Sequence, residues 1–409
     1  MATVVVIGGG PAGMMAAIAS SQLHKTILIE KNEKLGKKLF ITGKGRCNIT
    51  NAKDISEFFD YIPGNPTFLY SSLYSFTNED TMNFFKNLDV NLKVERGDRV
   101  FPQSDKSSDI IKAFERELIK RKVDIQVNSK VKKLVCENNT IKAVQLQDDK
   151  IIKGDYFIIC TGGMSYPQTG SSGDGYRFAE SVGHNITKIT PSLVPIEVKN
   201  SWIKDLQGLS LKNVELSIIN SNNKILFKEF GEMLFTHFGI SGPIALSASR
   251  VVNENSGQKA VINLKPALSY EELDKRVQKD FAKYSNKDFR NTLDDLLPKK
   301  LIEVLVQFSK IDPNKKANLI TRDERKQLVK LLQNFTLDIK GLRPIAEAIV
   351  TAGGVDTKEI DSSTMKSKLV SNLYFAGEVI DVDAYTGGYN IQIAMSTGHL
   401  AGSKISEIE

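Results

Sequence analysis

The pattern of apolar residues at the start of the chain predicts a strand, a glycine turn, a helix and a second strand. The apolar run Thr3–Ile7 leads into Gly8–Gly13, small residues continue through Ala19, and a second apolar run covers Thr26–Glu30. Two short apolar runs joined by a helix-length segment are typical of parallel strands with a crossover helix. The chain therefore opens with a βαβ unit.

The spacing of polar and apolar residues between 77 and 160 predicts further helices and strands of the same α/β unit. Thr77 and Asp80 form a capping-box pattern that indicates the start of a helix. Strand-like runs at 131–136 and 141–146 flank a short polar segment, which predicts a hairpin ahead of a strand at 156–160.

The pattern changes after Pro191, where β-type runs dominate, and changes again at the capping box Ser269–Glu272, where charged helical periodicity begins. Small residues and glycine pairs return from Gly341. We therefore expect four segments: the first part of an α/β domain over 1–190, an inserted antiparallel β-barrel over 191–268, a helical subdomain over 269–335, and the last part of the α/β domain over 336–409.

Composition narrows the class of protein. The 409 residues, 41% of them apolar, can fill two or three cores. Lys and Arg exceed Asp and Glu by 55 − 48 = 7, which favours anionic partners such as RNA or a nucleotide, although a solvated lysine-rich surface accounts for it equally well. Because Met1 leads directly into an apolar strand and charges follow, we expect a cytoplasmic protein with no membrane association.

Cysteine spacing argues against two kinds of site. Cys47, Cys136 and Cys160 lie far apart, are odd in number and show no CxxC spacing. We therefore expect reduced thiols, no disulfide framework and no metal.

The glycine turn has the spacing of a dinucleotide site. Gly8 permits a tight turn, Gly10 lets the backbone approach a pyrophosphate, Gly13 lets helix and strand pack closely, and the helix N-terminus supplies N–H groups. Glu30, at the end of the second strand, is placed to bind ribose hydroxyls. The expected contacts in this region are Gly8, Gly10, Pro11, Ala12, Gly13, Glu30 and Lys31.

Two later segments favour FAD as the dinucleotide. IICTGG, with Thr161 and Gly162, and LYFAGEVID are apolar strands that enter small-residue turns, which ordinary buried strands also do. In TGGYNIQIA, however, a glycine pair precedes a helix that begins near Tyr389 or Asn390, so free N–H groups face an acceptor that gains negative charge. Reduced flavin is such an acceptor.

Five motifs together resemble a known family. GGGPAG, GKGRCNITN, GDRVFP, FTHFGISGP and AGEVIDVDAYTGGYNIQIA are similar to those of the BaiN/YhiN-like FAD-dependent flavoproteins, also called the aminoacetone oxidase family. The resemblance implies an α/β fold with a glutathione-reductase-like FAD-binding Rossmann domain, interrupted by an antiparallel β-barrel and a small helical subdomain.

The resemblance also implies cofactor contacts in later segments. They are Lys37 and Lys38 near the phosphates, Val131 beside the adenine, Gly377 and Glu378 near the ribityl and pyrophosphate, and Asn390, Ile391 and Gln392 over the isoalloxazine. Many related folds have Asp where this chain has Glu378, which leaves that contact open, and the two lysines fit a solvated surface equally well.

The resemblance further implies reduction of an activated C=C bond, with uridine in ribosomal RNA or a similar enone as the expected substrate. Such a reduction needs a proton donor, and Cys47, His237 and Tyr385 are the candidates; a buried structural thiol and a hydrogen-bonded structural imidazole are the competing interpretations for the first two.

Two alternatives stay open: a small-amine oxidase that produces peroxide, and an RNA-binding factor whose flavin is structural. The segment Thr169–Tyr176 is glycine-rich but does not directly follow an apolar strand, so no second nucleotide domain is predicted, and NAD(P)H is left as a transient electron donor. We expect no stable protein partner.

Overall fold

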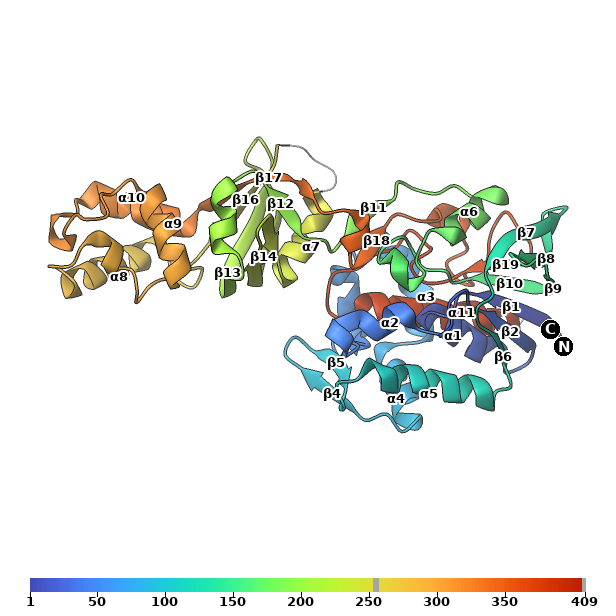
Figure 1. Ribbon diagram of the computed structural model, residues 1–409. Helices are drawn as coiled ribbons and strands as arrows, with labels where there is room; N and C mark the ends of the chain where they lie inside the picture. Colours follow the sequence, from blue (N-terminus) through green and yellow to red (C-terminus); the bar gives the residue numbers. More distant parts are fainter. Residues whose placement is uncertain (253–256, 407–409) are drawn as a thin grey trace. The chain divides into compact units, whose positions relative to one another are not determined.

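The computed structural model describes residues 1–252 and 257–406 (Figure 1). The chain divides into two compact units. Unit 1 comprises residues 1–192 and the segment from 345 onward, and unit 2 comprises residues 193–344. Each is described by itself.

A five-stranded parallel sheet is the centre of unit 1. Its order is β19 (Leu373–Phe375), β10 (Tyr156–Ile159), β1 (Thr3–Ile7), β2 (Lys25–Ile29), β6 (Asp124–Gln126). Helix α1 (Pro11–Ser20) connects β1 to β2, which confirms the predicted βαβ unit. The apolar residues of β1 are buried because a parallel sheet is covered on both faces.

Helix α11 (Tyr389–Ser406) lies beside α1, as Figure 1 shows. A Cβ on Gly398 would lie 2.2 Å from the carbonyl oxygen of Ala12, and a Cβ on Gly402 would lie 2.4 Å from that of Ala16. Both glycines are on one face of α11 because they are four residues apart. The two helices therefore approach more closely than larger residues would allow.

Smaller sheets and helices surround this centre. The sheets are β3 (Thr50–Asn51), β5 (Arg99–Pro102) and β4 (Leu92–Glu95); β7 (Val131–Glu137), β8 (Thr140–Leu146) and β9 (Ile151–Lys153); and the pair β11 (Thr190–Ser192) and β18 (Val350–Ala352). The helices are α2 (Lys37–Ile41), α3 (Tyr70–Ser75), α4 (Asn78–Asn87), α5 (Ser107–Lys120) and α6 (Asp174–Ser181). The hairpin β7–β8 and the Thr77–Asp80 capping box of α4 confirm two predictions.

Unit 2 contains a closed antiparallel barrel. Its order is β12 (Ile196–Val198), β15 (Gly239–Ser241), β14 (Ile225–Phe235), β13 (Ser210–Ile219), β16 (Lys259–Asn263), β17 (Phe335–Leu342). The helices of unit 2 are α7 (Pro243–Val252), α8 (Tyr270–Lys283), α9 (Lys299–Ser309) and α10 (Arg322–Gln333). The barrel and the helices share one apolar core, so they form a single unit.

One predicted boundary is wrong. Residues 336–344 were assigned to the last part of the α/β domain, but β17 pairs with β12 and β16 and closes the barrel. Buried and exposed residues alternate along Phe335–Lys340, which is the pattern of a half-buried strand. Its partners lie far away in sequence, so local periodicity did not reveal where it belongs.

Within the described residues, no helix is long and apolar enough to cross a membrane.

The close contact of α1 and α11 can be tested by adding one methyl group. Gly398→Ala forces that methyl against Ala12, so we expect unfolding free energy to fall by about 1–3 kcal/mol from overpacking, although alanine gains about 1 kcal/mol of helix propensity. Chemical denaturation measures the change. A Cβ on Gly341 would meet no described atom within 4 Å, so Gly341→Ala is the matched control. Equal stabilities for both variants would contradict the proposed tight contact.

Candidate functional site

In the glycine turn after β1, Gly10 has room for a side chain, whereas Gly8 and Gly13 do not. A Cβ on Gly8 would lie 2.5 Å from the carbonyl oxygen of Cys160, and a Cβ on Gly13 would lie 1.8 Å from that of Gly8. Around Gly10, in contrast, no described atom lies within 4 Å of an added Cβ, and no described side chain caps α1 there. The start of α1 therefore presents N–H groups to open space, as an anionic pyrophosphate requires.

Glu30 lies at the end of β2 and bonds to the glycine turn. Its Oε2 accepts the Gly9 N–H at 2.7 Å, and its Oε1 accepts the backbone N–H and side-chain Nδ2 of Asn32 at 2.8 and 2.7 Å. A carboxylate has about four acceptor sites, so three are used and one remains. Glu30 both holds the turn and can accept a ribose hydroxyl.

The segment that leads into Val131 crosses the same edge of the sheet. The Ser129 N–H donates to the Glu30 carbonyl at 2.9 Å, and Val131 then begins β7 as a buried residue. The structure thus brings Val131 to the Glu30 end of the glycine turn, and its contact with the adenine stays a prediction.

Two lysines predicted to contact the cofactor, Lys31 and Lys37, pair with carboxylates of the protein. Lys31 Nζ donates to Asp174 Oδ2 at 2.6 Å, and Lys37 Nζ lies 3.1 Å from Glu33 on the surface. Burial opposes ionisation of Asp174, but hydrogen bonds from Lys31 and Arg177 hold the pKa of its carboxyl below the usual value. The structure therefore does not support Lys31 and Lys37 as cofactor contacts, because each ammonium already neutralises a carboxylate.

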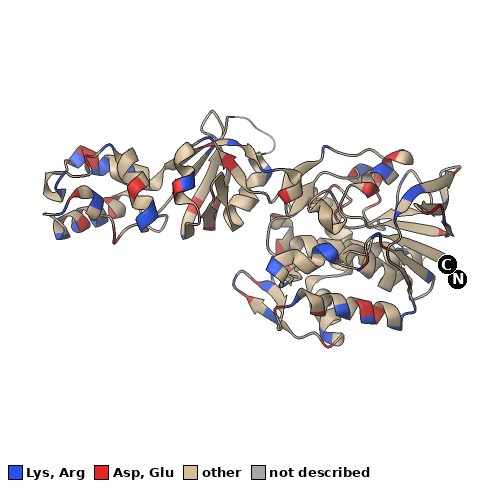
Figure 2. Cartoon of the chain, in the orientation of Figure 1, with Lys and Arg blue, Asp and Glu red and all other residues tan. Residues whose placement is uncertain are grey.

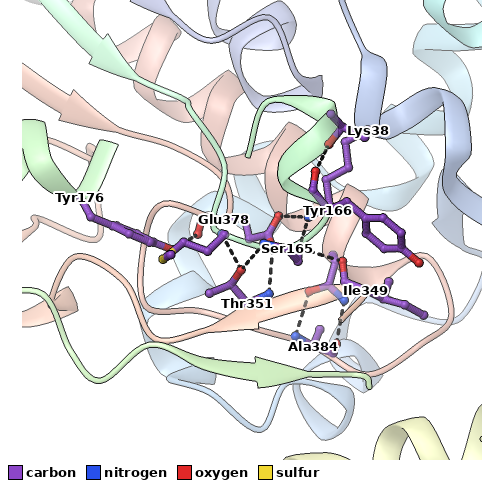
Figure 3. Close-up of polar contacts among 11 residues, drawn as sticks. Lys38, Ser165, Tyr166, Tyr176, Ile349, Thr351, Glu378 and Ala384 are labelled. Atoms are coloured by element: carbon purple, nitrogen blue, oxygen red, sulfur yellow. Dashed lines mark hydrogen bonds and ion pairs between the residues drawn. The ribbon is translucent and has the colours of Figure 1, made fainter. Parts of the chain in front are cut away.

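Lys38 and Glu378 bind each other in a polar cluster that joins several segments (Figure 3). Lys38 Nζ lies 2.7 Å from Glu378 Oε2 and 2.5 Å from Ser165 Oγ. The other carboxylate oxygen, Oε1, accepts the Thr351 N–H at 2.8 Å. The cluster ties α2 and the turn after β19 to β18.

Both side chains are thus bonded within the protein, and their contacts with the cofactor stay predictions. A glutamate reaches one methylene further than the aspartate of related folds, and here that reach places its carboxylate on Lys38 and Thr351. Gly377 lies beside the start of α1, because a Cβ there would lie 2.8 Å from the Ala12 Cβ, and its contact with the ribityl and pyrophosphate stays a prediction.

The start of α11 follows the glycine pair Gly387 and Gly388, which have φ angles of +138° and +102°. The Asn390 side chain closes the preceding loop by accepting the Ala384 N–H at 2.9 Å and donating to the Ala384 carbonyl at 2.7 Å. Ile391 is half-buried in the first turn. The helix thus begins at a loop that its own side chain stabilises.

Gln392 does not present its side chain to a ligand. It is fully buried, its Oε1 accepts the Thr50 hydroxyl at 2.7 Å, and its Nε2 donates to the Phe76 carbonyl at 3.0 Å. Its side chain attaches α11 to β3, and the position of the residue over the isoalloxazine stays a prediction.

The segment GKGRCNITN connects to this helix through its last residues, while Cys47 turns inward. The Cys47 thiol is fully buried, and burial raises its pKa to about 12 although a hydrogen bond with Thr42 opposes the rise. A side chain with no exposed surface cannot give a proton to a substrate. The structure therefore contradicts the catalytic role predicted for Cys47.

Arg46 holds the same segment to a neighbouring strand pair. Its Nε donates to Asp105 Oδ1 at 2.7 Å, its Nη2 pairs with Glu95, and its guanidinium stacks over the Phe101 ring at 4.2 Å. Arg46 is thus a structural residue of the loop.

Five buried side-chain oxygens have no hydrogen-bond partner in the part of the chain that the structure describes. Two of them lie in segments predicted to border the cofactor: Asn48 Oδ1, inside GKGRCNITN, and Thr161 Oγ1, at the end of β10. Buried polar atoms are nearly always hydrogen-bonded, so their lack of partners fits a ligand that supplies donors. Gly162 follows with φ +72°, which turns the chain away from the strand.

The remaining candidate acids lie in different units. Tyr385 is half-buried in the loop before α11, and its N–H donates to the Tyr61 carbonyl at 2.9 Å. His237 is exposed in the turn between β14 and β15 of unit 2. Tyr61 stacks on Tyr389 with ring centroids 4.6 Å apart.

Sequence reasoning missed three residues around α11: Thr50, Asn51 and Tyr61. Their positions come from contacts with a segment more than 300 residues later, and only the ITN end of the family motif indicated that region.

The residues present fit FAD. Four features of unit 1 are suited to it: the open, uncapped start of α1, the free acceptor site of Glu30, the start of α11 after a glycine pair, and the oxygens of Asn48 and Thr161 that lack partners. Throughout the described ranges, no group of three His, Cys, Asp or Glu side chains could hold a metal ion.

Comparison with known proteins gives the family. The model of the HI0933-like protein Rossmann domain matches residues 2–404. The chain is 31% identical to the 3-dehydro-bile acid delta(4,6)-reductase of Clostridium scindens over 98% of both chains. It is 33% identical to the ribosomal RNA dihydrouridine synthase of Escherichia coli, with 96% of this chain and 95% of that protein aligned.

Solved structures agree on the fold. A flavocytochrome c3 fumarate reductase superposes with a TM-score of 0.52 at 16% identity, covering 99% of this chain and 78% of the other. The 3-ketosteroid delta1-dehydrogenase of Sterolibacterium denitrificans superposes with a TM-score of 0.51 at 12% identity over the whole of both chains. The chain therefore belongs to the HI0933-like family of FAD-binding Rossmann proteins and is an FAD-dependent oxidoreductase.

Proposed function

We propose that this enzyme reduces the C5=C6 double bond of a uridine in ribosomal RNA to dihydrouridine. The observation that carries the proposal is the similarity to ribosomal RNA dihydrouridine synthases, at 33% identity in Escherichia coli and 30% in Haemophilus influenzae, along nearly the whole chain. Relatives that align from end to end share both the cofactor domain and the insertion.

The cofactor is proposed to lie along the edge of the parallel sheet. The start of α1 at Gly10 binds the pyrophosphate, Glu30 binds the adenosine ribose, and the start of α11 faces the pyrimidine edge of the flavin. The support is the open space at Gly10, the free acceptor site of Glu30 and the glycine pair before α11. When bound, FAD would supply the hydride that C6 of the uracil accepts, with NAD(P)H proposed as the transient electron donor.

The uracil C5 atom then needs a proton, which we assign to Tyr385. A phenol has a reference pKa of about 10 and is protonated at neutral pH. The backbone of Tyr385 is fixed by its bond to Tyr61 directly before α11, and its side chain is only half-buried. Cys47 is unsuitable because its thiol is enclosed, and His237 stays the alternative donor.

The helices of unit 2 are proposed to contact the RNA backbone. Residues 269–335 contain 15 Lys and Arg and 11 Asp and Glu. Their excess of 15 − 11 = 4 positive charges is more than half of the whole chain's net charge of +7. Figure 2 shows both signs of charge spread over these helices. Lys275 and Lys279 lie one turn apart on α8 and are exposed, and neither pairs with a carboxylate in the described chain. Unpaired cations of this kind can neutralise phosphates.

A second candidate substrate is a steroid enone, favoured by 31% identity to a bile acid reductase over 98% of the chain. The same hydride and proton transfers would reduce it, but a small apolar substrate needs no cationic docking surface. The two candidates therefore differ in their dependence on the lysines of α8.

The substrate proposal predicts that reduced protein is reoxidised by unmodified ribosomal RNA and that dihydrouridine appears in nucleosides analysed by mass spectrometry. The double variant Lys275→Glu, Lys279→Glu should lower kcat/KM for RNA at least tenfold and reduce the slope of log affinity against log salt by about 2. Lys133→Glu with Lys153→Glu is the matched control, because both lysines are exposed on the β7–β9 sheet of unit 1.

Reoxidation by a steroid enone without any by RNA would instead support the second candidate. Equal RNA turnover by both double variants would remove α8 from the docking surface.

The ribose assignment predicts that Glu30→Ala binds FAD about 10–100-fold more weakly, since a hydrogen bond to a charged group contributes about 1.5–3 kcal/mol. Reconstitution of the apoprotein, followed by flavin fluorescence, measures the affinity. Glu33→Ala, which removes only a surface ion pair with Lys37, should leave it unchanged. Full FAD content in Glu30→Ala protein would show that another group binds the ribose.

If Tyr385 is the proton donor, Tyr385→Phe should slow substrate-dependent flavin reoxidation by about 10²–10⁴-fold. The variant should still bind the substrate, which accepts the hydride. Cys47→Ala should reoxidise at the normal rate, because the thiol is buried. Stopped-flow absorbance of the flavin measures both rates. A normal rate in Tyr385→Phe together with a loss in Cys47→Ala would reverse the assignment.

A further inference from the structure

The peptide between Gly387 and Gly388, directly before α11, is held by a side chain from β3. Asn51 Nδ2 donates to the Gly387 carbonyl at 3.1 Å and to the Gly97 carbonyl at 3.0 Å, and its Oδ1 accepts the Lys53 N–H at 3.1 Å. Asn51 is 1% exposed. All the polar atoms of its amide are therefore used, and its position is fixed.

This bond determines the direction of the neighbouring N–H. In a trans peptide the C=O and N–H groups point in opposite directions, and no described peptide bond is cis. Because the Gly387 carbonyl points to Asn51, the Gly388 N–H of the same peptide points away from β3. No described group accepts a hydrogen bond from this N–H.

Without such a bond the peptide would have little to hold its orientation. Both glycines have positive φ angles, and glycine adopts either sign of φ with little cost. A Cβ on Gly388 would lie 2.4 Å from the Thr50 carbonyl oxygen, so glycine is required for β3 to approach this closely. The backbone is therefore adaptable, and Asn51 selects one orientation.

Other bonds hold β3 itself in place. Thr50 Oγ1 donates to Gln392 Oε1 at 2.7 Å, and Asn78 Nδ2 donates to the carbonyls of Asn51 and Lys53, both at 2.8 Å. Asn78 thus supports the same strand as Asn51 but does not contact Gly387.

We propose that Asn51 is a positioning residue that raises the redox potential of bound FAD by aiming the Gly388 N–H at the flavin edge that becomes negative on reduction. The proposal rests on the flavin position given under Proposed function. An N–H fixed before reduction stabilises the developing charge without reorganisation, and it adds to the free N–H groups of the first turn of α11. Reduced flavin therefore gains more from this peptide than oxidised flavin does.

The test measures the two-electron midpoint potential of the bound flavin in three variants. Asn51→Ala removes the donor without adding charge, and Asn51→Asp removes it with little change of shape. Both variants should weaken the binding of reduced FAD about tenfold more than the binding of oxidised FAD. This change lowers the midpoint potential by about 30 mV for a two-electron couple. Asn78→Asp introduces the same charge and loosens the same strand, so its potential should stay near that of the unaltered protein.

If a variant loses its flavin during purification, titration of the apoprotein with oxidised and with reduced FAD gives the same ratio of affinities. Equal weakening of both forms would mean that Asn51 is only structural, and a shift in Asn51→Asp without one in Asn51→Ala would assign the effect to charge. Either result overturns the proposal, as does an equal shift in Asn78→Asp. No RNA is used, so failure of the substrate proposal leaves this test unaffected.

Discussion

The close approach of α1 and α11 is the contact on which the cofactor site depends. Gly398 removes the side chain that would collide with the Ala12 carbonyl, so the last helix of the chain lies against the first one. This contact joins segments from the two ends of the sequence and holds both helix starts in one unit, that of α1 directly after β1 of the parallel sheet and that of α11 against β3. Two positive helix ends in one unit fit a cofactor with a pyrophosphate at one end and a charge-accepting ring at the other.

The segment GKGRCNITN serves this arrangement as a support. Arg46 bonds to carboxylates beside it, Cys47 fills the core, and the final Thr50 and Asn51 bond to the start of α11. A cysteine beside glycines and cations has the local features of a reactive thiol, but reactivity depends on exposure and pKa, which burial decides here. The chemistry of the motif therefore lies in the hydrogen bonds of its polar neighbours.

Several cations near the predicted cofactor segments of unit 1 form ion pairs within the protein. Lys31, Lys37 and Lys38 each have a carboxylate within 3.1 Å, and Glu378 has both its oxygens engaged. A lysine that already neutralises a carboxylate offers little net attraction to a phosphate. Backbone N–H groups, which carry no counter-charge, are left as the main anion-binding groups, and this is consistent with the open position at Gly10.

The sequence by itself determined the βαβ unit, the β7–β8 hairpin, the helix caps at Thr77 and Ser269, and the glycine turn with Glu30, because each depends on neighbours a few residues away. Only the tertiary structure decided that β17 closes the barrel, that Cys47 is enclosed and that Gln392 bonds to Thr50. Burial and long-range pairing arise from contacts between segments up to several hundred residues apart, so local periodicity does not reveal them. Sequence motifs therefore indicated which residues to expect near the cofactor. The tertiary structure decided which atoms of those residues are buried or hydrogen-bonded within the protein.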